Sequence, residues 1–475
     1  MNRRKSTELV AHLMRRAGFG ASYNQIVEGV SKGYEALVDD LLDTEDSSWM
    51  GDFMVRRFHH EQSGMMGPWA SGDNWLYRMV TTTAPLQEKM ALFWHMIFCA
   101  GHSKIDSGYE MGRMIEMFRE HGMGNFRDLI YRLSTSPGMM FYLDNTESHQ
   151  AALNENYGRE LLELFSLGAG KDEELNYSED DVKACARAFT GWNNAPAYPP
   201  FPYGRSPWEF RFDPADHDDG EKTFLGETGA WNGDDILDII CKQPATARFL
   251  ARHLYNYFVA DDVQIPAWRL TPPQDLDLIQ KMEKAYFDSE YDITEMLRIL
   301  FNSEKFKSES VRYAKVKSPA EVVAGTLRMV EEHREIKLGL FQHSQEPKYM
   351  GMDLMNPPTV EGWHTGREWI DSGTLVERIN YASELLGNTD LPGVKGLIDR
   401  LMSRGDSLSP ETFVDGCLDL IGPITVDDGT RSELVAHAQK SGDLHHGSSS
   451  EQIDFTRRTG EMFQMIASTA EFQFE

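Results

Sequence analysis

The chain has 475 residues, of which 41% are hydrophobic and 11% aromatic, so it can bury enough apolar surface to form a globular protein of roughly two or three packed units. Its formal net charge of -28 argues against nucleic acid as a partner, because that affinity depends on Lys and Arg side chains that neutralise phosphates. The four cysteines lie far apart without a Cys-x-x-Cys pair, which argues against a disulfide framework or a cysteine zinc site.

No segment of the chain carries the pattern of a signal peptide or of a membrane helix. Charged residues interrupt the apolar ones throughout residues 1–20, and no stretch reaches the roughly 18 apolar residues that a membrane span needs. The sequence therefore predicts a cytoplasmic protein without a membrane partner, and leaves export together with a partner protein open.

Apolar residues recur at helical spacing along most of the chain. The pattern predicts helices over residues 8–17, 24–42, 111–120, 125–134, 235–241, 245–259, 274–286, 293–302, 320–337 and 375–386. We therefore expect a mainly α protein, a multi-helix orthogonal bundle with long ordered loops and at most a short β-hairpin.

Three regions are expected along the chain. Residues 1–192 form an N-terminal helical unit, and residues 193–390 form a second helical unit that packs on the first as one body. Residues 391–475 form a C-terminal helical extension.

Pro85 begins a strongly apolar helix, where a proline is favoured because the first turn leaves its N–H groups unpaired. Glu88, His95 and His102 recur every seven residues and would share one face if the helix ran that far, although Gly101 interrupts its last turn. Two interpretations are open: a core helix whose histidine binds a neighbouring carboxylate, or one wall of a catalytic site.

Residues 154–168 predict a helix with a cap at each end. Asn154 can accept an unpaired N–H at the start, and Gly168 can adopt the left-handed conformation that ends a helix. One face is apolar, and the other carries a polar ridge made of Asn156, Arg159, Glu160 and Glu163. A polar ridge on so apolar a helix indicates either an interior site or a buried polar network.

Three later segments are also dense in chemically active or rigid residues. Residues 193–208, rich in Pro, Tyr and Phe, predict a rigid loop. Residues 212–226 hold the densest group of Asp together with His217 and Lys222, and a short hairpin is expected near their end. These acids could satisfy backbone N–H groups in a polar turn, or bind a hard cation or perform acid–base catalysis, although their spacing does not match a calcium loop. Residues 351–370 combine prolines and glycines with Trp363, which predicts an ordered, packed loop.

Several of these segments, in this order, resemble a known family. They are residues 11–20, 88–95, 154–165, 190–192, His217 with 222–226, 315–319, and 356–363. Together they are similar to the large bacterial family catalogued as domain of unknown function 1800, over nearly the whole chain.

The resemblance implies a predominantly helical protein without a settled activity. It also implies a partner, because such proteins often accompany a secreted protein of the alkaline-phosphatase and sulfatase type. Relatives tend to carry a second histidine two residues after the Trp-His pair that ends at His95. This chain has Ile97 there, and His102 is the alternative.

If these segments meet in space, they predict a site for acid–base catalysis, which needs pairs of groups with shifted pKa values in a dry pocket. His95 would be the base, Glu160 its orienting partner, and His217 an acid or ligand. The expected substrate-binding residues are Asn156, Arg159, Trp192, Lys222 and Trp363. A dimetal site in a bundle would normally show Glu-x-x-His on two helices, whereas the central helix offers Glu160 and Glu163 at that spacing. The metal and the cofactor stay unidentified.

Two functions follow from this pattern. The first is an enzyme with a His and carboxylate site, such as a metal-assisted hydrolase or an oxidoreductase. The alternative is a non-catalytic accessory or binding protein for a phosphatase-like or sulfatase-like partner, in which the polar residues form a structural network. An enzyme should bring His95, Glu160 and His217 to one cavity, whereas an accessory protein should seal and pair these side chains. The sequence contains no nucleophile elbow, phosphate-binding loop or dinucleotide fingerprint.

Overall fold

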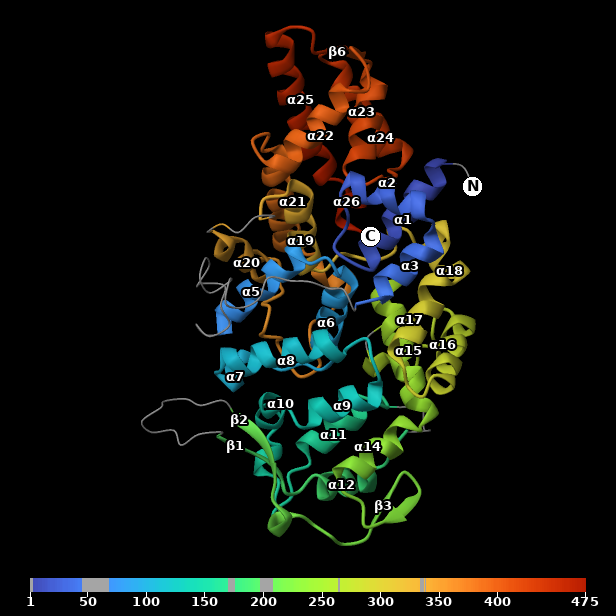
Figure 1. Ribbon diagram of the computed structural model, residues 1–475, viewed down its shortest axis with the longest axis vertical. Coiled ribbons are helices and arrows are strands. Elements are labelled where there is room, and N and C mark those ends of the chain that lie inside the picture. Colours follow the sequence, from blue (N-terminus) through green and yellow to red (C-terminus); the bar gives the residue numbers. More distant parts are fainter. Residues whose placement is uncertain are drawn as a thin grey trace.

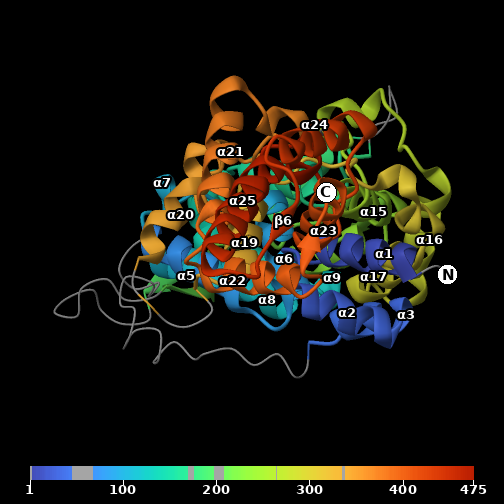
Figure 2. The ribbon, with the colours of Figure 1, turned by 90° about the horizontal axis from the view of Figure 1, so that it is seen from above.

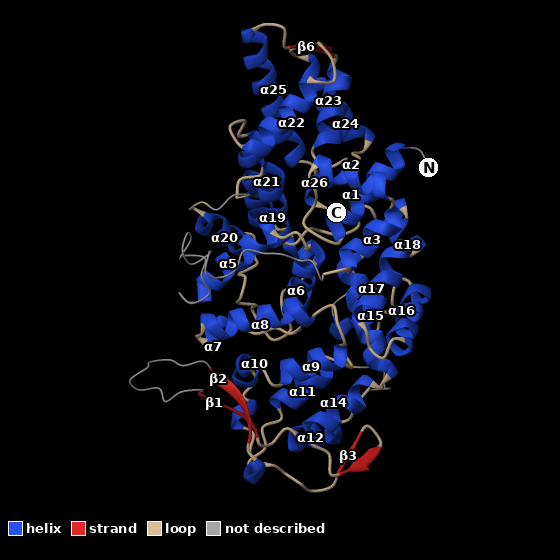
Figure 3. Cartoon of the chain, in the orientation of Figure 1, coloured by secondary structure: helices blue, strands red, loops and turns tan. Residues whose placement is uncertain are grey.

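The computed structural model describes residues 3–44, 68–169, 176–196, 208–263, 265–333, 337 and 339–475. In these ranges the chain is mainly helical, with three antiparallel pairs of short strands (Figure 3). The mainly α fold class predicted from the periodicity is therefore confirmed. The strand pairs are no longer than five residues per strand, and one of them is the hairpin expected near the end of residues 212–226. None of the described helices is long and apolar enough to cross a bilayer.

The first part of the chain builds the side and the centre of the molecule (Figure 1). Its helices are α1 (Arg3–Arg16), α2 (Tyr23–Lys32), α3 (Tyr34–Leu42), α5 (Pro68–Thr81), α6 (Pro85–Ile97), α7 (His102–Ile105) and α8 (Gly108–His121). α6 is buried on almost every side, including its polar residues Glu88, Lys89 and His95. It ends at Ile97, so His102 begins a separate helix and does not extend the face of Glu88 and His95.

The next elements form the end of the molecule that is lowest in Figure 1. They are α9 (Phe126–Ser134), α10 (Pro137–Tyr142), η2 (Asn145–Glu147), α11 (Asn156–Glu163), α12 (Glu179–Ala188), β1 (Trp192–Pro196), β2 (Trp208–Phe212), η3 (Pro214–Asp216), β3 (Lys222–Phe224), β4 (Glu227–Gly229) and α14 (Gly233–Cys241). β1 pairs with β2, so both ends of the predicted loop at residues 193–208 are extended strands, and residues 197–207 lie outside the described ranges.

α11 is shorter than the helix predicted over residues 154–168. The N-cap is Glu155 and the C-cap is Leu164, so neither predicted residue occupies a cap position. Asn154 still accepts the N–H of Asn156 at 3.0 Å, and Gly168 has a φ of +68° beyond the helix end. After Leu164, however, the N–H groups of Leu167 and Gly168 both bond to the carbonyl of Leu162, which closes a wide turn in place of a further helical turn.

The β3–β4 hairpin has a two-residue turn, Leu225 and Gly226, with φ values of +48° and +85°. Positive φ at both central residues gives the twist that matches two antiparallel strands. The hairpin predicted near the end of residues 212–226 therefore forms, a few residues further along the chain.

The remaining elements complete the side and the opposite end. They are α15 (Pro244–Phe258), η4 (Ile265–Arg269), α16 (Leu276–Asp288), α17 (Ile293–Asn302), α18 (Glu304–Lys307), η5 (Glu309–Val311), α19 (Pro319–Val330), α20 (Leu340–Tyr349), η6 (Gly366–Trp369), α21 (Ser372–Gly387), α22 (Pro392–Met402), β5 (Ser407–Leu408), α23 (Pro410–Leu420), α24 (Asp428–Gln439), β6 (Leu444–His445), α25 (Ser449–Ala467) and α26 (Ala470–Gln473). Seen along the long axis, α22 and α25 lie over α19 and α21, with which they pack (Figure 2).

A buried charge network joins these parts. Lys89 of α6 is fully buried and forms an ion pair with Glu321 of α19, while its Nζ also donates to the carbonyl of Gly18 at 2.9 Å. The carboxylate of Glu475 lies 3.8 Å from the same Nζ. Burial by itself would raise the pKa of Glu321, but the nearby charges of Lys89 and Lys315 lower it to about 2. Glu321 therefore stays ionised in the folded protein.

Replacing Lys89 by Ala should destabilise the fold by about 3–5 kcal/mol, because it leaves Glu321 buried without its partner. Unfolding in denaturant measures this loss. Replacing both members together, Lys89→Met with Glu321→Leu, should recover part of it, since the carboxylate of Glu321 is then no longer buried without its partner. The matched control is Arg431→Ala, which breaks a half-exposed pair with Asp415 and should change stability by less than about 1 kcal/mol. Equal losses for Lys89→Ala and Arg431→Ala would contradict the importance of the network.

Candidate functional site

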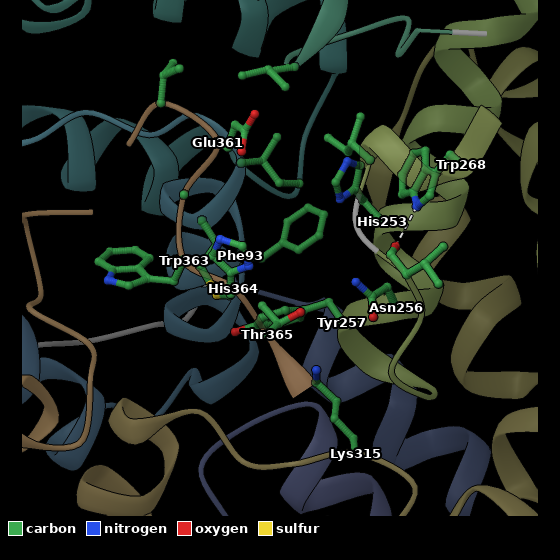
Figure 4. A pocket seen from close by; sticks show the side chains of 17 residues that line it. Phe93, His253, Asn256, Tyr257, Trp268, Lys315, Glu361, Trp363, His364 and Thr365 are labelled. Atoms are coloured by element: carbon green, nitrogen blue, oxygen red, sulfur yellow. Dashed lines mark hydrogen bonds between the residues drawn. The ribbon is translucent and has the colours of Figure 1, made fainter. Parts of the chain in front are cut away.

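A cavity of about 140 Å³ lies between α6 and α15 and is bounded by the loop 360–365 (Figure 4). Its wall is mainly aromatic and aliphatic, and a few polar side chains reach it. The polar residues are His253, Asn256, Lys315, Glu361, His364 and Thr365. A largely apolar pocket with a small number of polar groups is typical of a small-molecule site.

Two tryptophans form walls of the cavity and stand at opposite sides of the view in Figure 4. Trp363 is 5% exposed and belongs to the loop 360–365. Trp268 is held by a hydrogen bond of 2.7 Å from its Nε1 to the carbonyl of Val263. The guanidinium of Arg252 lies 4.5 Å from the Trp268 ring centroid and pairs with Asp262 at 2.8 Å. The indole of Trp268 is therefore fixed from two directions.

His253 of α15 lies in the cavity wall, with its ring centroid 4.7 Å from that of Trp268. Its Nε2 is buried and has no hydrogen-bond partner among the described residues. Burial, and secondly the charge of Arg252, lower the pKa of His253 to about 3. The ring is therefore neutral at physiological pH and offers an unpaired nitrogen, which a polar group of a ligand could satisfy.

Lys315 brings a positive charge to the cavity. Its Nζ lies 3.1 Å from Oδ1 of Asp261 and 5.6 Å from the ring centroid of Tyr257, which also lines the cavity. The same carboxylate of Asp261 accepts the backbone N–H of Val316 at 3.1 Å. The ion pair with Asp261 thus fixes the position of the Lys315 ammonium group.

A group of carboxylates borders the cavity on the side of α11. Glu361 lines the cavity, and its charge acts on Glu160. The pKa of Glu160 is raised from 4.5 to about 7, first by burial and then by the charge of Glu163, and Arg159 opposes the shift only in part. Glu160 can therefore hold a proton near neutral pH, on the helix next to the loop that carries Glu361.

His95 lies behind the cavity wall. Its ring packs edge-on between Trp75 and Trp363, with centroid distances of 5.5 Å to each. The side chain is fully buried, and neither ring nitrogen has a hydrogen-bond partner among the described residues. Burial lowers the pKa of His95 to about 3, so the ring is neutral. Among the residues predicted to share a site with His95, Trp363 is the one whose ring packs against it, and Trp363 lines the cavity.

His217 and Lys222 lie elsewhere: His217 directly follows η3, and Lys222 is the first residue of β3. The Nδ1 of His217 is 2.8 Å from the carbonyl of Thr190. The Nζ of Lys222 donates to the carbonyl of Gly220 at 3.0 Å and to that of Asp218. Neither residue lines the cavity. Both side chains bond to nearby backbone carbonyls, as expected if residues 212–226 form a polar turn.

The other three predicted residues are paired or packed. Arg159 donates two hydrogen bonds to Glu179, of 2.9 and 2.8 Å, and the amide of Asn156 donates to the carbonyl of Leu143 at 3.2 Å. Trp192 is buried in an aromatic group with Phe189, Tyr131 and Phe210.

The structure thus brings three of the four predicted segments together: the His95 helix, the Glu160 helix and the Trp363 loop. The His217 loop is not part of this group. Several residues that line the cavity were not predicted from the sequence, among them His253, Trp268, Lys315 and Glu361. For His253 a signal exists, because with Asn256 and Tyr257 it lies at helical spacing and forms a polar patch on α15.

Comparison with known proteins gives one match. The family model described as protein of unknown function, DUF1800, matches residues 12–474. No curated protein and no solved structure matches the chain.

Replacing Glu160 by Gln should stabilise the protein at high pH. The raised pKa means that the folded state favours the protonated carboxyl, so wild-type stability falls as the pH rises from about 4.5 through about 7. Gln avoids this cost, and after discounting for solvent screening the gain above about pH 8 should be on the order of 1–2 kcal/mol. At about pH 4 the two proteins should have equal stability.

Unfolding curves at both pH values test this expectation. Glu179→Gln is the control of opposite sign, because Arg159 lowers the pKa of the exposed Glu179, so that its loss should weaken the protein at high pH. A stability difference between Glu160→Gln and wild type that does not depend on pH would show that Glu160 ionises as in the unfolded chain.

Proposed function

We propose that this chain, which belongs to the DUF1800 family of proteins of unknown function, is an acid–base enzyme for a small molecule with a flat or apolar face. The observation that carries the proposal is the cavity itself, which joins two tryptophan walls, the unpaired nitrogen of His253 and the carboxylate Glu361. Such a combination of apolar surface and convergent polar groups fits a binding site with chemistry.

Binding would use the apolar walls and His253 together. A flat ligand can pack against Trp363 or Trp268, and one of its polar groups can bond to the nitrogen of His253, whose burial without a partner is costly in the free protein. Because His253 is neutral, this contact favours an uncharged donor or acceptor on the ligand. Lys315 adds a positive charge that an acidic group of the ligand could approach.

Proton transfer would use Glu361 and Glu160. Glu361 borders the cavity and can exchange a proton with a bound ligand, while Glu160, whose pKa is raised to about 7, can hold a proton near neutral pH. Glu361 is then the group that meets the substrate, and Glu160 is a positioning residue that acts through it. We favour hydrolysis over oxidoreduction, because hydrolysis needs from the protein only a proton donor, a proton acceptor and orientation of the substrate.

The accessory function remains a second candidate, favoured by a different observation. Arg159, His217 and Lys222 bond to Glu179 or to backbone carbonyls, as expected for side chains that specify packing. In this case the phosphatase-like or sulfatase-like partner would bind elsewhere on the acidic surface, and the cavity would hold a ligand without converting it.

Hydrolysis of a panel of p-nitrophenyl compounds, namely esters, phosphates, sulfates and glycosides, tests the proposal. The wild type should release p-nitrophenol from one class. Glu361→Gln should lower kcat by roughly a hundredfold to ten-thousandfold, as expected for loss of a proton-transfer group. Glu160→Gln should remove the ionisation at about pH 7 from the rate profile. His253→Ala should mainly raise KM.

The matched control is Glu461→Gln, because Glu461 is a half-exposed carboxylate on α25 that pairs with Arg457 and does not line the cavity. It should leave kcat unchanged. Turnover that survives Glu361→Gln with the same pH profile would refute the assignment of Glu361. Absence of turnover with the whole panel, together with capture of a phosphatase-like or sulfatase-like protein, would favour the accessory function.

A further inference from the structure

A second group of chemically active side chains lies outside the cavity, where α19 ends and α20 and α21 pack against each other. Glu332 and His333 follow directly after α19, and His343 lies on α20. The three residues each offer one ligand atom, and these atoms all lie within 4.8 Å of one another. None of the three lines the cavity described above.

The geometry of the two histidines is set by tight packing. His333 is 1% exposed, and its ring lies 5.3 Å from that of His343, at an angle of 78° between the planes. Two imidazoles that meet edge to face, one of them fully buried, are held in place by the fold. Their nitrogens can therefore approach a common point without ordering a flexible side chain first, which lowers the entropic cost of binding an ion.

A second layer of polar groups surrounds this cluster. The hydroxyl of Tyr381, on α21, lies 3.1 Å from Nδ1 of His343, and a hydrogen bond of this kind fixes the ring of a ligating histidine. The pKa of Tyr381 is raised well above its usual value, first by burial and then by the charges of Glu346, Glu332 and Glu384. Three carboxylates are thus close to this region, which makes it favourable for a cation.

The cluster also contains a lysine that can act as a competing cation. Nζ of Lys337 lies 2.5 Å from Oε1 of Glu332. A metal ion that takes the carboxylate of Glu332 as a ligand would compete with this ammonium group. Removal of the lysine charge should therefore strengthen metal binding, whereas removal of a metal ligand should weaken it.

We propose that Glu332, His333 and His343 bind a divalent cation of the zinc class. Two imidazoles and one carboxylate are a common ligand set for zinc, and imidazole nitrogen favours zinc and similar transition metals over magnesium and calcium. Three protein ligands leave a fourth position open to water. Because the ligands follow α19 and lie on α20, and Tyr381 lies on α21, the ion ties these helices together.

Zinc binding to the full chain, after dialysis against EDTA, tests the proposal. Calorimetric titration with zinc chloride and metal analysis of the reloaded protein should give one ion per chain, with no displacement by excess magnesium. His343→Ala and Glu332→Gln should each weaken binding by at least about tenfold, the lower limit seen when even an outer-shell partner is lost. Lys337→Met should tighten binding. Cobalt in place of zinc should show the visible absorption of a four-coordinate ion.

The matched control is His121→Ala, because His121 also lies near two carboxylates, Glu120 at 3.7 Å and Asp128 at 3.4 Å, on another part of the molecule. It should bind zinc as the wild type does. Far-UV circular dichroism checks that each variant is folded, and if His343→Ala is not, Glu332→Gln decides the test. Zinc binding below one ion per chain in the wild type, or binding that the folded ligand variants retain unchanged, would overturn the proposal.

Discussion

The burial of the Lys89 charge constrains the centre of this protein more than any other single interaction. A charge removed from water must be paired and hydrogen-bonded, and the groups that do so come from distant parts of the chain. Gly18 follows α1, Glu321 lies in the first turn of α19, and Glu475 lies beyond α26. The carbonyl of Lys89 also accepts the hydroxyl of Tyr257 from α15, at 3.4 Å. α6 is therefore held in one position relative to α1, α15 and α19.

The cavity depends on this placement of α6. Phe93, Met96 and Ile97 form one of its walls, and the loop 360–365 closes over the end of the same helix. Gly362 allows that close approach. It has a φ of +88°, and a Cβ atom there would stand 2.6 Å from the carbonyl oxygen of Met96 and 2.8 Å from Sγ of Cys99. The glycine thus lets the backbone lie on the helix end and sets the flanking residues Glu361 and Trp363 against the cavity.

Polar side chains in this protein fall into two kinds, and the difference bears on function. Those of the His217 loop and of Arg159 are satisfied by carbonyls or by a carboxylate, so their polar atoms are used by the fold. His253, at the cavity, keeps an unpaired nitrogen, and Glu160, on the neighbouring α11, has a raised pKa. An unpaired polar atom costs stability, and beside a cavity a ligand can satisfy it. The cavity is therefore the better candidate for chemistry, although the His217 loop is richer in charged residues.

The sequence by itself determined the helical nature of the protein and the main positions of interest. Periodic apolar residues and a proline at the start of α6 act locally, so their effect can be predicted without the fold. Only the tertiary structure decided which polar residues meet. His95 and Trp363 are far apart in sequence yet pack together, while His217 joins the turn that contains it. The pKa values of Glu160 and His253 likewise arise from burial and from charges on other elements, which no local pattern contains.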